Sequence, residues 1–436
     1  MPASQELAEV QSALLSLDMR PTLLVILGSY LPGYKSGGPI RSIANLVSAL
    51  GQEVTFRIVT LDRDLGEHSP FPGIVANRWV RVGHADVMYL RPGILGLLRI
   101  CRLLRSIDRN SGLYLNSFFA RRASMLPVLM RWLGLCRPRS VIIAPRGEFS
   151  AGALRIKSVR KRLFIRLAKS LGLYQGLIWH ASSEFEAVDI SRQFSLSRSV
   201  RVASVIPSAD GHAGKKRRSQ VAIASDLASA VPSSQRQRPP KVPGRLHIVF
   251  VSRLSRMKNL AGALKMVAGI SGQVSLDLYG PLEDAAYWAE CRDLISALPE
   301  NIQVRYLGQI AHEEIGLAFA THELFLLPTF GENFGHVIAE ALLAGCPVLI
   351  SDQTPWRGLE ALGVGWDLPL TASARFREVL QHCVDMGPEE HAVMCARATE
   401  FAERRANDPN VIEENRALFQ YALGLGSGLI SGPKVV

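Results

Sequence analysis

The sequence predicts an α/β protein built from two Rossmann-like domains. Its 436 residues exceed the usual size of one domain, and 48% of them are hydrophobic, so each half can bury a core of its own. Apolar runs typical of buried strands alternate with helical segments along the chain, as parallel sheets require. The pattern is plainest between residues 325 and 351, where a strand, a loop, a helix and a second strand follow one another.

This segment reads FLLPTFGENFGHVIAEALLAGCPVLIS. Phe325 to Leu327 predicts a strand that ends at Pro328, and Val348 to Ser351 predicts the next strand. Between them, apolar residues recur with a helical period from Phe334 to Ala344, and the helix stops at Gly345. The segment is therefore a βαβ unit with a polar loop before its helix.

Two glutamates flank the start of this helix. Glu332 precedes it, and Glu340 follows eight residues later, a rise of roughly 12 Å at about 1.5 Å per residue. The backbone N–H groups of residues 331–335 lie between the two carboxylates, and a helix N-terminus can hold phosphate. The pair fits a nucleotide sugar, with one carboxylate on ribose hydroxyls and the other on sugar hydroxyls. Alternatively, Glu332 caps the helix and Glu340 is a solvated helix residue.

Four more segments accompany it in a fixed order: GSYLPGYKSGGPIRS at 28–42, APRGEF at 144–149, WHASSEFE at 179–186 and VSRLSRMKN at 251–259. Together with the two glutamates, this set resembles the retaining family 4 glycosyltransferases and their E-x7-E element, over most of residues 21–400. The resemblance implies the GT-B fold, in which two Rossmann-like domains face each other across a cleft. It also implies a donor bound mainly by the second domain and an acceptor bound by the first.

The resemblance also implies roles for single residues. Arg253 and Lys258 flank a tight turn, so their cationic heads can converge on one anion, and the family assigns them to the donor diphosphate. With Glu332 they form the expected catalytic set. Glu340 is expected to bind ribose, and the remaining donor-binding residues are Gly37, Gly38, Asn333, Phe334 and Gly335.

The first half holds the expected acceptor residues. Where relatives often carry a histidine that contacts the reacting sugar, this chain has Pro145, Arg146 and Gly147. Arg146 is then a candidate for an acceptor phosphate and Glu148 for an acceptor hydroxyl, although a structural ion pair fits both as well. His180 lies where a strand meets a helix, which favours a structural role.

No cofactor or metal is expected. Asp62 and Asp64 form a D-x-D pair, which holds a divalent cation in glycosyltransferases of the other major fold, but the other motifs belong to the metal-independent GT-B type. The six cysteines have neither C-x-x-C spacing nor histidine partners at zinc-ligand spacing.

Charge is spread unevenly along the chain. Residues 1–200 hold 27 Lys and Arg against 13 Asp and Glu, whereas residues 246–436 hold 14 against 23. A basic first half indicates an anionic partner: a membrane surface, a lipid diphosphate or nucleic acid. Residues 153–174 carry seven cations and no acid around an apolar stripe of Ile156, Leu163, Phe164, Leu167 and Leu171. This pattern favours a helix on an anionic membrane, or a domain helix with a solvated basic face.

The expected divisions are a tail at 1–20, an acceptor domain at 21–207, a flexible basic insert at 208–245, a nucleotide-sugar domain at 246–387, and helices that cross back at 388–436. No apolar run reaches the roughly 20 residues of a membrane span, and residues 1–19 lack the cations of a secretory signal. We therefore expect a cytoplasmic protein, peripheral at the inner face of the cytoplasmic membrane.

The expected function is transfer of a sugar from a nucleotide-diphosphate sugar to a hydroxyl acceptor, such as a lipid-linked glycan, with retention of configuration. The resemblance places it in bacterial exopolysaccharide, capsule or lipopolysaccharide synthesis. Two alternatives are an epimerase or phosphorylase with the same fold, and a basic nucleic-acid-binding protein. The last explains the basic charge but not the acidic second half with its paired glutamates.

Overall fold

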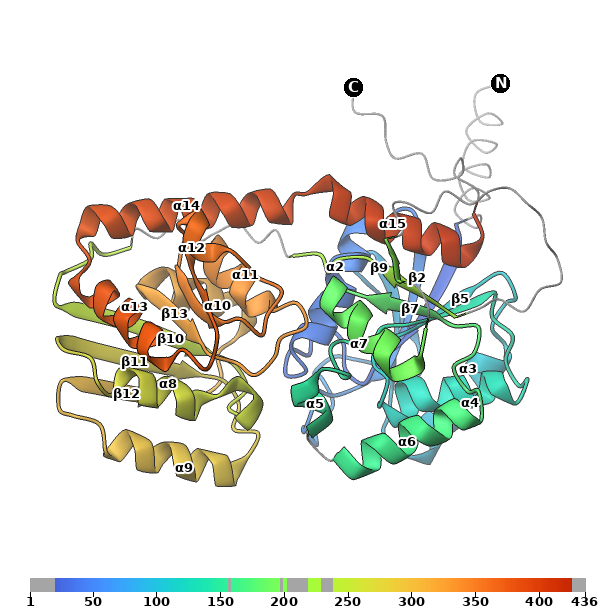
Figure 1. The fold of residues 1–436 in the computed structure, drawn as a ribbon. Coiled ribbons are helices and arrows are strands. Elements are labelled where there is room, and N and C mark those ends of the chain that lie inside the picture. The colour runs from blue at the N-terminus through green and yellow to red at the C-terminus, as the bar shows by residue number, and fades with distance from the viewer. Residues whose placement is uncertain (1–19, 156–157, 197–198, 202–218, 229–237, 426–436) are drawn as a thin grey trace, which may run out of the picture. The chain divides into compact units, whose positions relative to one another are not determined.

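The computed structural model describes residues 20–155, 158–196, 199–201, 219–228 and 238–425 (Figure 1). Its chain divides into two compact units. Unit 1 takes in residues 1–149, 157–225 and 410–436, and unit 2 takes in residues 150–156 and 226–409. The division is not a simple cut in sequence, because the last helix returns to the first unit.

Unit 1 is built on one sheet. Among the described residues it has nine strands in the order β3-β4-β2-β1-β5-β6-β7-β9-β8, all paired in parallel except β3 with β4. The strands are β1 (Thr22–Ile26), β2 (Thr55–Leu61), β3 (Trp79–Val82), β4 (Ala85–Leu90), β5 (Gly112–Leu115), β6 (Ser140–Ile143), β7 (Ile178–Ala181), β8 (Ser199–Arg201) and β9 (Gln220–Ile223). Their near-continuous Val, Ile and Leu content fits a sheet covered on both faces.

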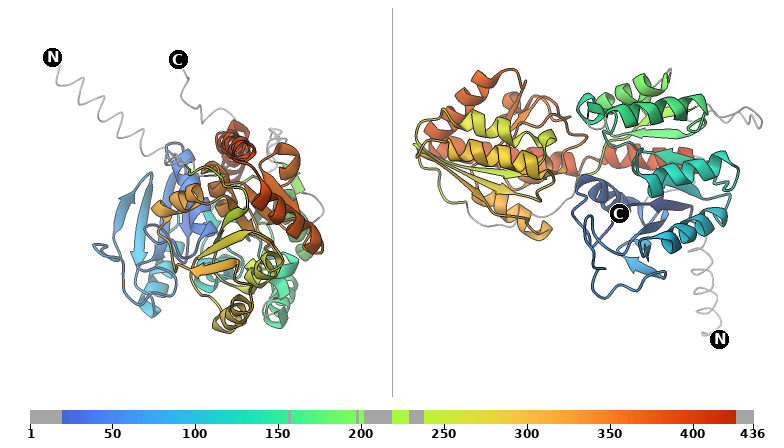
Figure 2. Two further views of the ribbon diagram at one scale, coloured as in Figure 1. Left: turned by 90° about the vertical axis from the view of Figure 1, so that its left-hand side faces the viewer. Right: turned by 90° about the horizontal axis from the view of Figure 1, so that it is seen from below.

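The helices of unit 1 are α2 (Gly38–Leu50), α3 (Ile94–Arg105), the π-helix η1 (Arg121–Met125), α4 (Leu126–Trp132), α6 (Ser158–Ser170), α7 (Glu184–Phe194) and α15 (Pro409–Leu423). Helices α3, α4 and α6 lie side by side on one side of this unit (Figures 1 and 2). The indole N–H of Trp132 joins α4 to the end of α6 by donating to the carbonyl oxygen of Leu171 at 3.0 Å.

An aromatic cluster forms the core beneath α6. The ring of Phe118 lies 4.6 Å from that of Tyr174, and the rings of Trp179 and Phe194 lie 4.5 Å apart. Phe164 of α6 contacts Phe118 at 5.6 Å, so this face of α6 points inward.

The apolar stripe expected on α6 therefore divides between two faces. Phe164 packs into the core, whereas Leu163, Leu167 and Leu171 are exposed. Ile156 lies outside the described residues. Helix α6 thus carries leucines on its outer surface beside its cations.

Helix α15 packs against the sheet of unit 1. The ring of Phe419 lies 6.0 Å from Phe56 of β2 and 6.1 Å from Tyr114 of β5. Arg416 adds a two-pronged hydrogen bond to Glu53, with both N···O distances below 3.0 Å. Both the aromatic contacts and this charged pair hold the C-terminal helix on unit 1.

Unit 2 is built on a second sheet. Among the described residues its six parallel strands have the order β12-β11-β10-β13-β14-β15. They are β10 (Arg245–Val251), β11 (Gln273–Tyr279), β12 (Ile302–Tyr306), β13 (Leu324–Leu327), β14 (Val348–Ser351) and β15 (Gly365–Leu368). The strands expected at 325–327 and 348–351 are confirmed to within one residue as β13 and β14.

The helices of unit 2 are α5 (Ala151–Arg155), the 3₁₀-helix η3 (Arg256–Lys258), α8 (Leu260–Val267), α9 (Ala285–Ser296), α10 (His312–Thr321), α11 (His336–Leu343), α12 (Leu359–Leu362), α13 (Ser373–Asp385) and α14 (Pro388–Ala406). Helix α11 packs against α10, α14 and β14, while α8 packs against α9 and α13. One apolar core joins these helices to the six strands.

Part of the range 208–245, which was expected to be a flexible insert, forms regular structure. Gln220–Ile223 forms β9, because its apolar side chains pack into the unit 1 sheet. Residues 208–218 and 229–237 lie outside the described residues.

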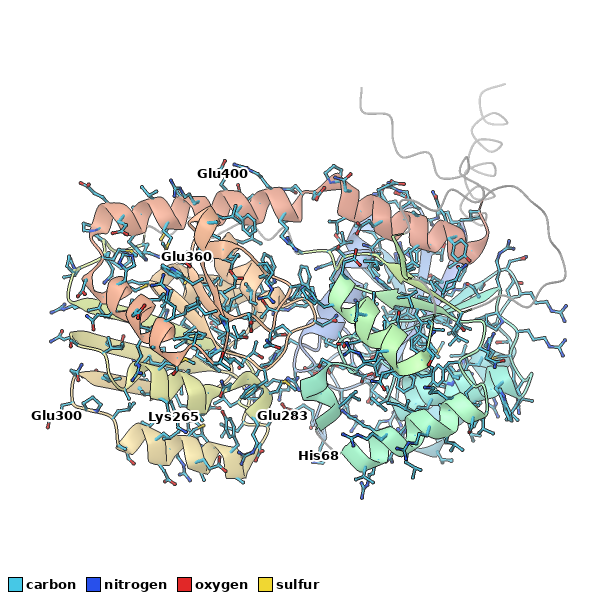
Figure 3. The ribbon with its side chains drawn as sticks, in the orientation of Figure 1. His68, Lys265, Glu283, Glu300, Glu360 and Glu400 are labelled. Carbon is cyan, nitrogen blue, oxygen red and sulfur yellow. The ribbon has the colours of Figure 1, made fainter. Side chains whose placement is uncertain are left out.

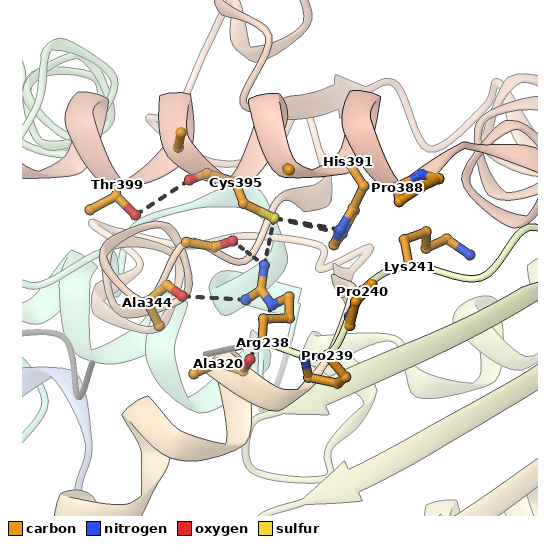
Figure 4. Close-up of a pocket in the computed structure, with 13 residues that line it drawn as sticks. Arg238, Pro239, Pro240, Lys241, Ala320, Ala344, Pro388, His391, Cys395 and Thr399 are labelled. Carbon is orange, nitrogen blue, oxygen red and sulfur yellow. Dashed lines mark hydrogen bonds between the residues drawn. The ribbon is translucent and has the colours of Figure 1, made fainter. Parts of the chain in front are cut away.

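Arg238, at the far end of this range, is anchored in unit 2. Its guanidinium donates to the carbonyl oxygens of Phe319 and Ala320 at the end of α10, both at 3.0 Å, and to that of Gly345 after α11 at 2.5 Å (Figure 4). It thereby satisfies carbonyls that the ends of two helices leave without partners. A cavity of about 360 Å³ beside it is lined by Lys241, His391 and Cys395.

Candidate functional site

The candidate site of unit 2 lies where the order in which the chain adds strands to the sheet reverses. The chain runs from β10 outward to β11 and β12, and then returns to place β13 on the other side of β10. In open parallel sheets, ligands bind beyond the carboxyl ends of the strands at such a switch point. The turn after β10 and the loop after β13 meet there, and they carry Lys258 and Glu332.

Asn259 shapes the turn after β10. Its backbone is left-handed, with φ of 58°, a conformation that asparagine adopts more readily than most residues. Its side-chain oxygen caps α8 by accepting from Gly262 N at 3.1 Å, and its side-chain nitrogen donates to Pro328 O at 2.9 Å. One asparagine thus ends η3, starts α8 and contacts the loop after β13.

Backbone hydrogen bonds join the two loops. The carbonyl oxygen of Met257 accepts from Phe330 N at 2.8 Å and from the Thr329 hydroxyl at 3.1 Å. Because Met257 precedes Lys258 and Phe330 lies two residues before Glu332, these bonds set the spacing of the two charged residues.

Lys258 and Glu332 form an ion pair between Nζ and Oε1, and each side chain is only 13% exposed. Removing water strengthens this attraction relative to a surface pair. An ammonium group has three N–H donors, so Lys258 can hold Glu332 and still donate to a phosphate oxygen. The pair therefore presents a cation next to a carboxylate that it orients.

Arg253 has a different partner. Its guanidinium lies 3.1 Å from the carboxylate of Glu283, which follows β11 and is labelled in Figure 3. Both side chains are more than 40% exposed, and such surface pairs contribute about 0–1 kcal/mol. Breaking this pair to bind an anion therefore costs little. Convergence of Arg253 and Lys258 on one diphosphate stays a prediction.

Helix α11 begins at His336, two residues later than expected, because Gly335 adopts a left-handed φ of 81°. A Cβ at Gly335 would lie 2.8 Å from Ile338 Cδ1 and 3.4 Å from the indole nitrogen of Trp356. That indole nitrogen donates to Phe334 O at 2.6 Å. The bend before α11 thus requires glycine and is held in place by Trp356.

Three N–H groups before α11 have no hydrogen-bond partner among the described residues. Gly331 N donates to the Thr329 hydroxyl at 3.2 Å and Glu332 N donates to Gln353 O at 3.0 Å, so two of the N–H groups of residues 331–335 already have partners within the protein. Within the described residues, no partner is found for the N–H groups of Asn333, Phe334 and Gly335. These three N–H groups are therefore the candidates for binding a phosphate at this helix start.

Glu340 is the fifth residue of α11, and its side chain is half-buried. Since the helix starts at His336, Glu340 lies about one turn inside it.

Unit 1 has its own switch point, between β1 and β5. The loop after β1 ends at Gly37, whose φ is 64°, and Gly38 begins α2. A Cβ at Gly37 would meet no atom within 4 Å, so its backbone is open to a ligand. Asn116, after β5, holds this helix start by donating to Pro39 O at 2.9 Å. The sequence alone does not indicate this role of Asn116, because the role follows only from the strand order.

Asp64 organises the loop that carries Gly37. Its carboxylate accepts from Tyr34 N at 2.7 Å, from Lys35 N at 3.0 Å and from the Ser29 hydroxyl at 2.9 Å. Burial alone would raise the pKa of Asp64, but these donors and Leu65 N hold that pKa below its usual range. Asp62 pairs with Arg63 at 2.8 Å. No group of three potential metal-binding side chains occurs among the described residues.

Arg146 and Glu148 both make contacts inside unit 1. Arg146 donates to the side-chain oxygen of Asn116 at 2.7 Å and to the Tyr114 hydroxyl at 2.8 Å. It therefore lies at the switch point beside the residue that holds α2.

Glu148 accepts from the Ser117 hydroxyl at 2.8 Å, from Phe118 N at 2.5 Å and from Phe119 N at 3.2 Å. Burial raises the pKa of its carboxyl above the usual range, although these donors lower it. Its hydrogen bonds shape the turn after β5 and leave little capacity for an acceptor hydroxyl.

His180 is buried and bonds the Tyr114 hydroxyl at 2.7 Å and Ala224 O at 2.8 Å. These contacts agree with the structural role expected for it.

Comparison with protein families finds a match in the second half of the chain. Residues 233–366 match the model of the glycosyl transferases group 1 family. A curated relative, the O-antigen chain mannosyltransferase B of Escherichia coli, is 27% identical over 114 residues. That alignment spans 25% of this chain and 29% of the relative.

Solved structures match nearly the whole chain. Anabaena HepE in complex with UDP and glucose covers 92% of this chain and all of its own length, with a TM-score of 0.60 and 16% identity. Sucrose-phosphate synthase from Thermosynechococcus elongatus covers 93% and all of its own length, with a TM-score of 0.63 and 15% identity. WaaG, a glycosyltransferase involved in lipopolysaccharide biosynthesis, covers 91% and 99% of its own length, with a TM-score of 0.57 and 13% identity.

These structural matches confirm the expected GT-B architecture. The family match spans Arg253, Lys258, Glu332 and Glu340, so residues 233–366 of this chain are similar to the glycosyl transferases group 1 family.

Proposed function

We propose that this protein transfers a sugar from a nucleotide-diphosphate sugar to a hydroxyl acceptor with retention of configuration. The observation that carries the proposal is the partly buried Lys258–Glu332 pair at the switch point of unit 2, next to the three N–H groups that precede α11. A cation, a carboxylate and a helix start in one place suit the diphosphate and hydroxyls of a sugar nucleotide.

Each residue of this group has a defined task in the proposal. Lys258 and Arg253 neutralise the diphosphate, and the N–H groups of Asn333 to Gly335 donate to its oxygens. Glu332, oriented by Lys258, accepts hydrogen bonds from the transferred sugar. Glu340 accepts from the ribose hydroxyls. Donor binding by Gly37 and Gly38 of unit 1 stays a prediction from the sequence.

The reaction needs no covalent enzyme intermediate. The bond between the anomeric carbon and the phosphate oxygen breaks while a bond to the acceptor oxygen forms on the same face of the sugar. The acceptor proton passes to the leaving diphosphate, so the acceptor becomes a glycoside and the donor a nucleoside diphosphate. Lys258 and Arg253 act on the charge that develops on this leaving group.

The relatives support a nucleotide-sugar donor and a role in surface polysaccharide assembly. HepE was solved with UDP and glucose, the curated relative is an O-antigen mannosyltransferase, and WaaG takes part in lipopolysaccharide biosynthesis. We infer a glycan acceptor attached to a lipid, in exopolysaccharide, capsule or lipopolysaccharide synthesis. Arg146, beside the switch point of unit 1, is the candidate contact for an acceptor phosphate.

We also infer that the protein is peripheral on an anionic membrane, at the inner face of the cytoplasmic membrane. Helix α6 supports this, because its leucines at 163 and 167 are 66% and 53% exposed and Arg160, Arg162 and Arg166 are exposed on the same helix. The neighbouring α4 adds Trp132, which is 46% exposed. Exposed leucines, tryptophan and arginines on adjacent helices fit the boundary of an anionic bilayer. Among the described residues, no helix is long and apolar enough to cross a membrane.

A donor panel tests the proposed activity. UDP-, GDP- and dTDP-sugars are incubated with the protein, with and without membrane lipid extract, and release of the nucleoside diphosphate is measured. We expect one donor to be consumed faster when the extract is present. An epimerase would convert the sugar without releasing nucleotide, so sugar conversion alone would replace the proposal with that alternative.

A further inference from the structure

Unit 1 contains a cavity of about 150 Å³ that the proposed donor chemistry does not use. It lies at the carboxyl ends of the neighbouring strands β1, β2 and β4, and α3 and η1 enclose it. Ligands of parallel sheets bind at this edge, and π-helices such as η1 often occur at functional sites. The cavity is therefore placed where a substrate of unit 1 would lie.

The interior of this cavity is apolar. Ile26, Val59, Leu90 and Ile100 line it and are each at most 6% exposed. Thr60 also lines it, is 2% exposed, and has no hydrogen-bond partner for its hydroxyl among the described residues. A sugar is poorly satisfied here, because Thr60 is the one polar residue besides Arg91 and Arg122 in the described lining, and several sugar hydroxyls would be buried without partners.

The mouth of the cavity is cationic. Arg91 and Arg122 line it and are exposed, and neither has an ion-pair partner in the described part of the chain. Gly28 lies between the strand ends and is exposed, and a Cβ there would meet no atom within 4 Å. Two guanidinium groups beside an open backbone suit phosphate or diphosphate.

The surface that continues from the mouth is apolar again. Helix α3, which forms one wall, begins three residues after Arg91 with Ile94 and Leu95, which are 67% and 76% exposed. Leu98, one turn further, is 48% exposed. Exposed apolar side chains beside arginines are typical of a surface that contacts a bilayer. They therefore favour a ligand that is anchored in a membrane over one that is dissolved in water.

We propose that this cavity binds the lipid anchor of the acceptor, specifically the branched hydrocarbon unit joined directly to its phosphate or diphosphate. A protein cavity of about this volume can hold a six-carbon ring, so it has room for one five-carbon prenyl unit. Arg91 and Arg122 bind the phosphate at the mouth, and the rest of the chain follows α3 towards the bilayer. This inference rests on the proposed function, because it names the anchor of the proposed acceptor.

The test is calorimetric titration of the full chain with geranyl diphosphate, with inorganic diphosphate and with a straight-chain alkyl phosphate. We expect geranyl diphosphate to bind at least tenfold more tightly than inorganic diphosphate. The alkyl phosphate should fall between them, because an unbranched chain fills the cavity less well. Equal affinity for geranyl and inorganic diphosphate would overturn the proposal.

A cavity-filling variant gives the second arm. Ala123 lines the cavity and is 6% exposed, so Ala123→Phe should remove the advantage of geranyl diphosphate and leave inorganic diphosphate binding unchanged. Leu129→Phe, at an exposed position on α4, is the matched control. If Ala123→Phe does not fold, Leu97→Phe, at a half-buried lining position, replaces it. Undiminished geranyl diphosphate binding in a folded cavity-filling variant would also refute the site.

Donor binding separates this proposal from the proposed function. Titration with the donor that the panel selects should give the same affinity for the parent and for Ala123→Phe. If no nucleotide sugar binds but geranyl diphosphate still does, the proposed function fails and the lipid site stands. If the donor binds and geranyl diphosphate does not, the reverse holds.

Discussion

The carbonyl oxygen of Met257 accepts a hydrogen bond of 2.8 Å from the backbone nitrogen of Phe330. This bond joins the turn that carries Lys258 to the loop that carries Glu332, which are 74 residues apart in sequence. The two charged groups therefore meet through the backbone geometry of neighbouring strands, before any ligand is present. A site fixed in this way loses less entropy when it binds its substrate.

Glu340→Ala should weaken donor binding. If Glu340 accepts hydrogen bonds from ribose, its loss costs roughly 1 to 3 kcal/mol, about 5- to 150-fold in the dissociation constant. The measurement is calorimetric titration with the donor that the panel selects. Glu300→Ala removes an exposed carboxylate of the same unit and should leave the affinity unchanged. An unaltered dissociation constant in folded Glu340→Ala would take this residue out of the site.

Asp64→Asn should destabilise unit 1 by about 1 to 3 kcal/mol at neutral pH, because an amide cannot accept all the hydrogen bonds that the carboxylate receives. The folded-state pKa of Asp64 lies below its ordinary value, so its stabilisation is complete above that ordinary value. It is lost as the pH falls through the folded-state pKa.

Denaturant unfolding from pH 7 down to pH 3 checks this expectation. The difference in unfolding free energy between the parent and Asp64→Asn should shrink as the pH falls below about 4. Asp293→Asn, at an exposed position on α9, is the control. A difference that stays constant with pH would mean that the Asp64 charge contributes nothing to stability.

Sugar transfer should survive treatment with EDTA. Asp64 accepts hydrogen bonds from the loop after β1, and Asp62 pairs with Arg63, so both carboxylates already have partners within the protein. The test compares nucleotide release before and after chelation. Activity that disappears in EDTA and returns with Mn²⁺ would restore Asp62 and Asp64 as a metal site.

Replacing Arg160, Arg162 and Arg166 together by Gln should release much of the protein from anionic vesicles, since each cation near such a surface contributes about 1 kcal/mol. Lys161 is left in place because its ammonium lies 5.1 Å from the centre of the Phe119 ring and supports the fold. Vesicle co-sedimentation at low and high salt is the measurement, and donor hydrolysis in solution should hardly change. Equal sedimentation of variant and parent at both salts would make these charges a solvated face only.

Strong local patterns were sufficient to predict much of the fold. Apolar runs next to proline predicted β13 and β14 to within one residue, and the alternation of strands and helices predicted two parallel sheets, although β15 was not predicted. The start of α11 was misplaced by two residues, because the helical period continues through Gly335 while the left-handed φ of that residue breaks the helix. Periodicity reports which face is buried and does not report a backbone bend.

Other parts of the site depend on contacts distant in sequence. Strand order determines several hydrogen bonds of the site. Trp356 donates to Phe334, Met257 and Asn259 bond to the loop after β13, and Asn116 donates to the start of α2. The sequence also could not show which face of α6 is exposed, because the same spacing of leucines fits a stripe that faces the core or one that faces solvent. Only the packing of Phe164 against Phe118 determines which side is outside.

Turnover of Lys258→Ala with the selected donor and acceptor tests the central claim most directly. Loss of this ammonium should lower kcat by on the order of 100-fold, because charge on the leaving diphosphate is no longer stabilised. Lys265→Ala, which removes an exposed cation of α8 (Figure 3), should match the parent, and thermal unfolding should show that both variants are folded. The assignment of this site to sugar transfer would be contradicted if folded Lys258→Ala kept a kcat within about twofold of the parent. Such a difference corresponds to a change of only about 0.4 kcal/mol in the activation barrier.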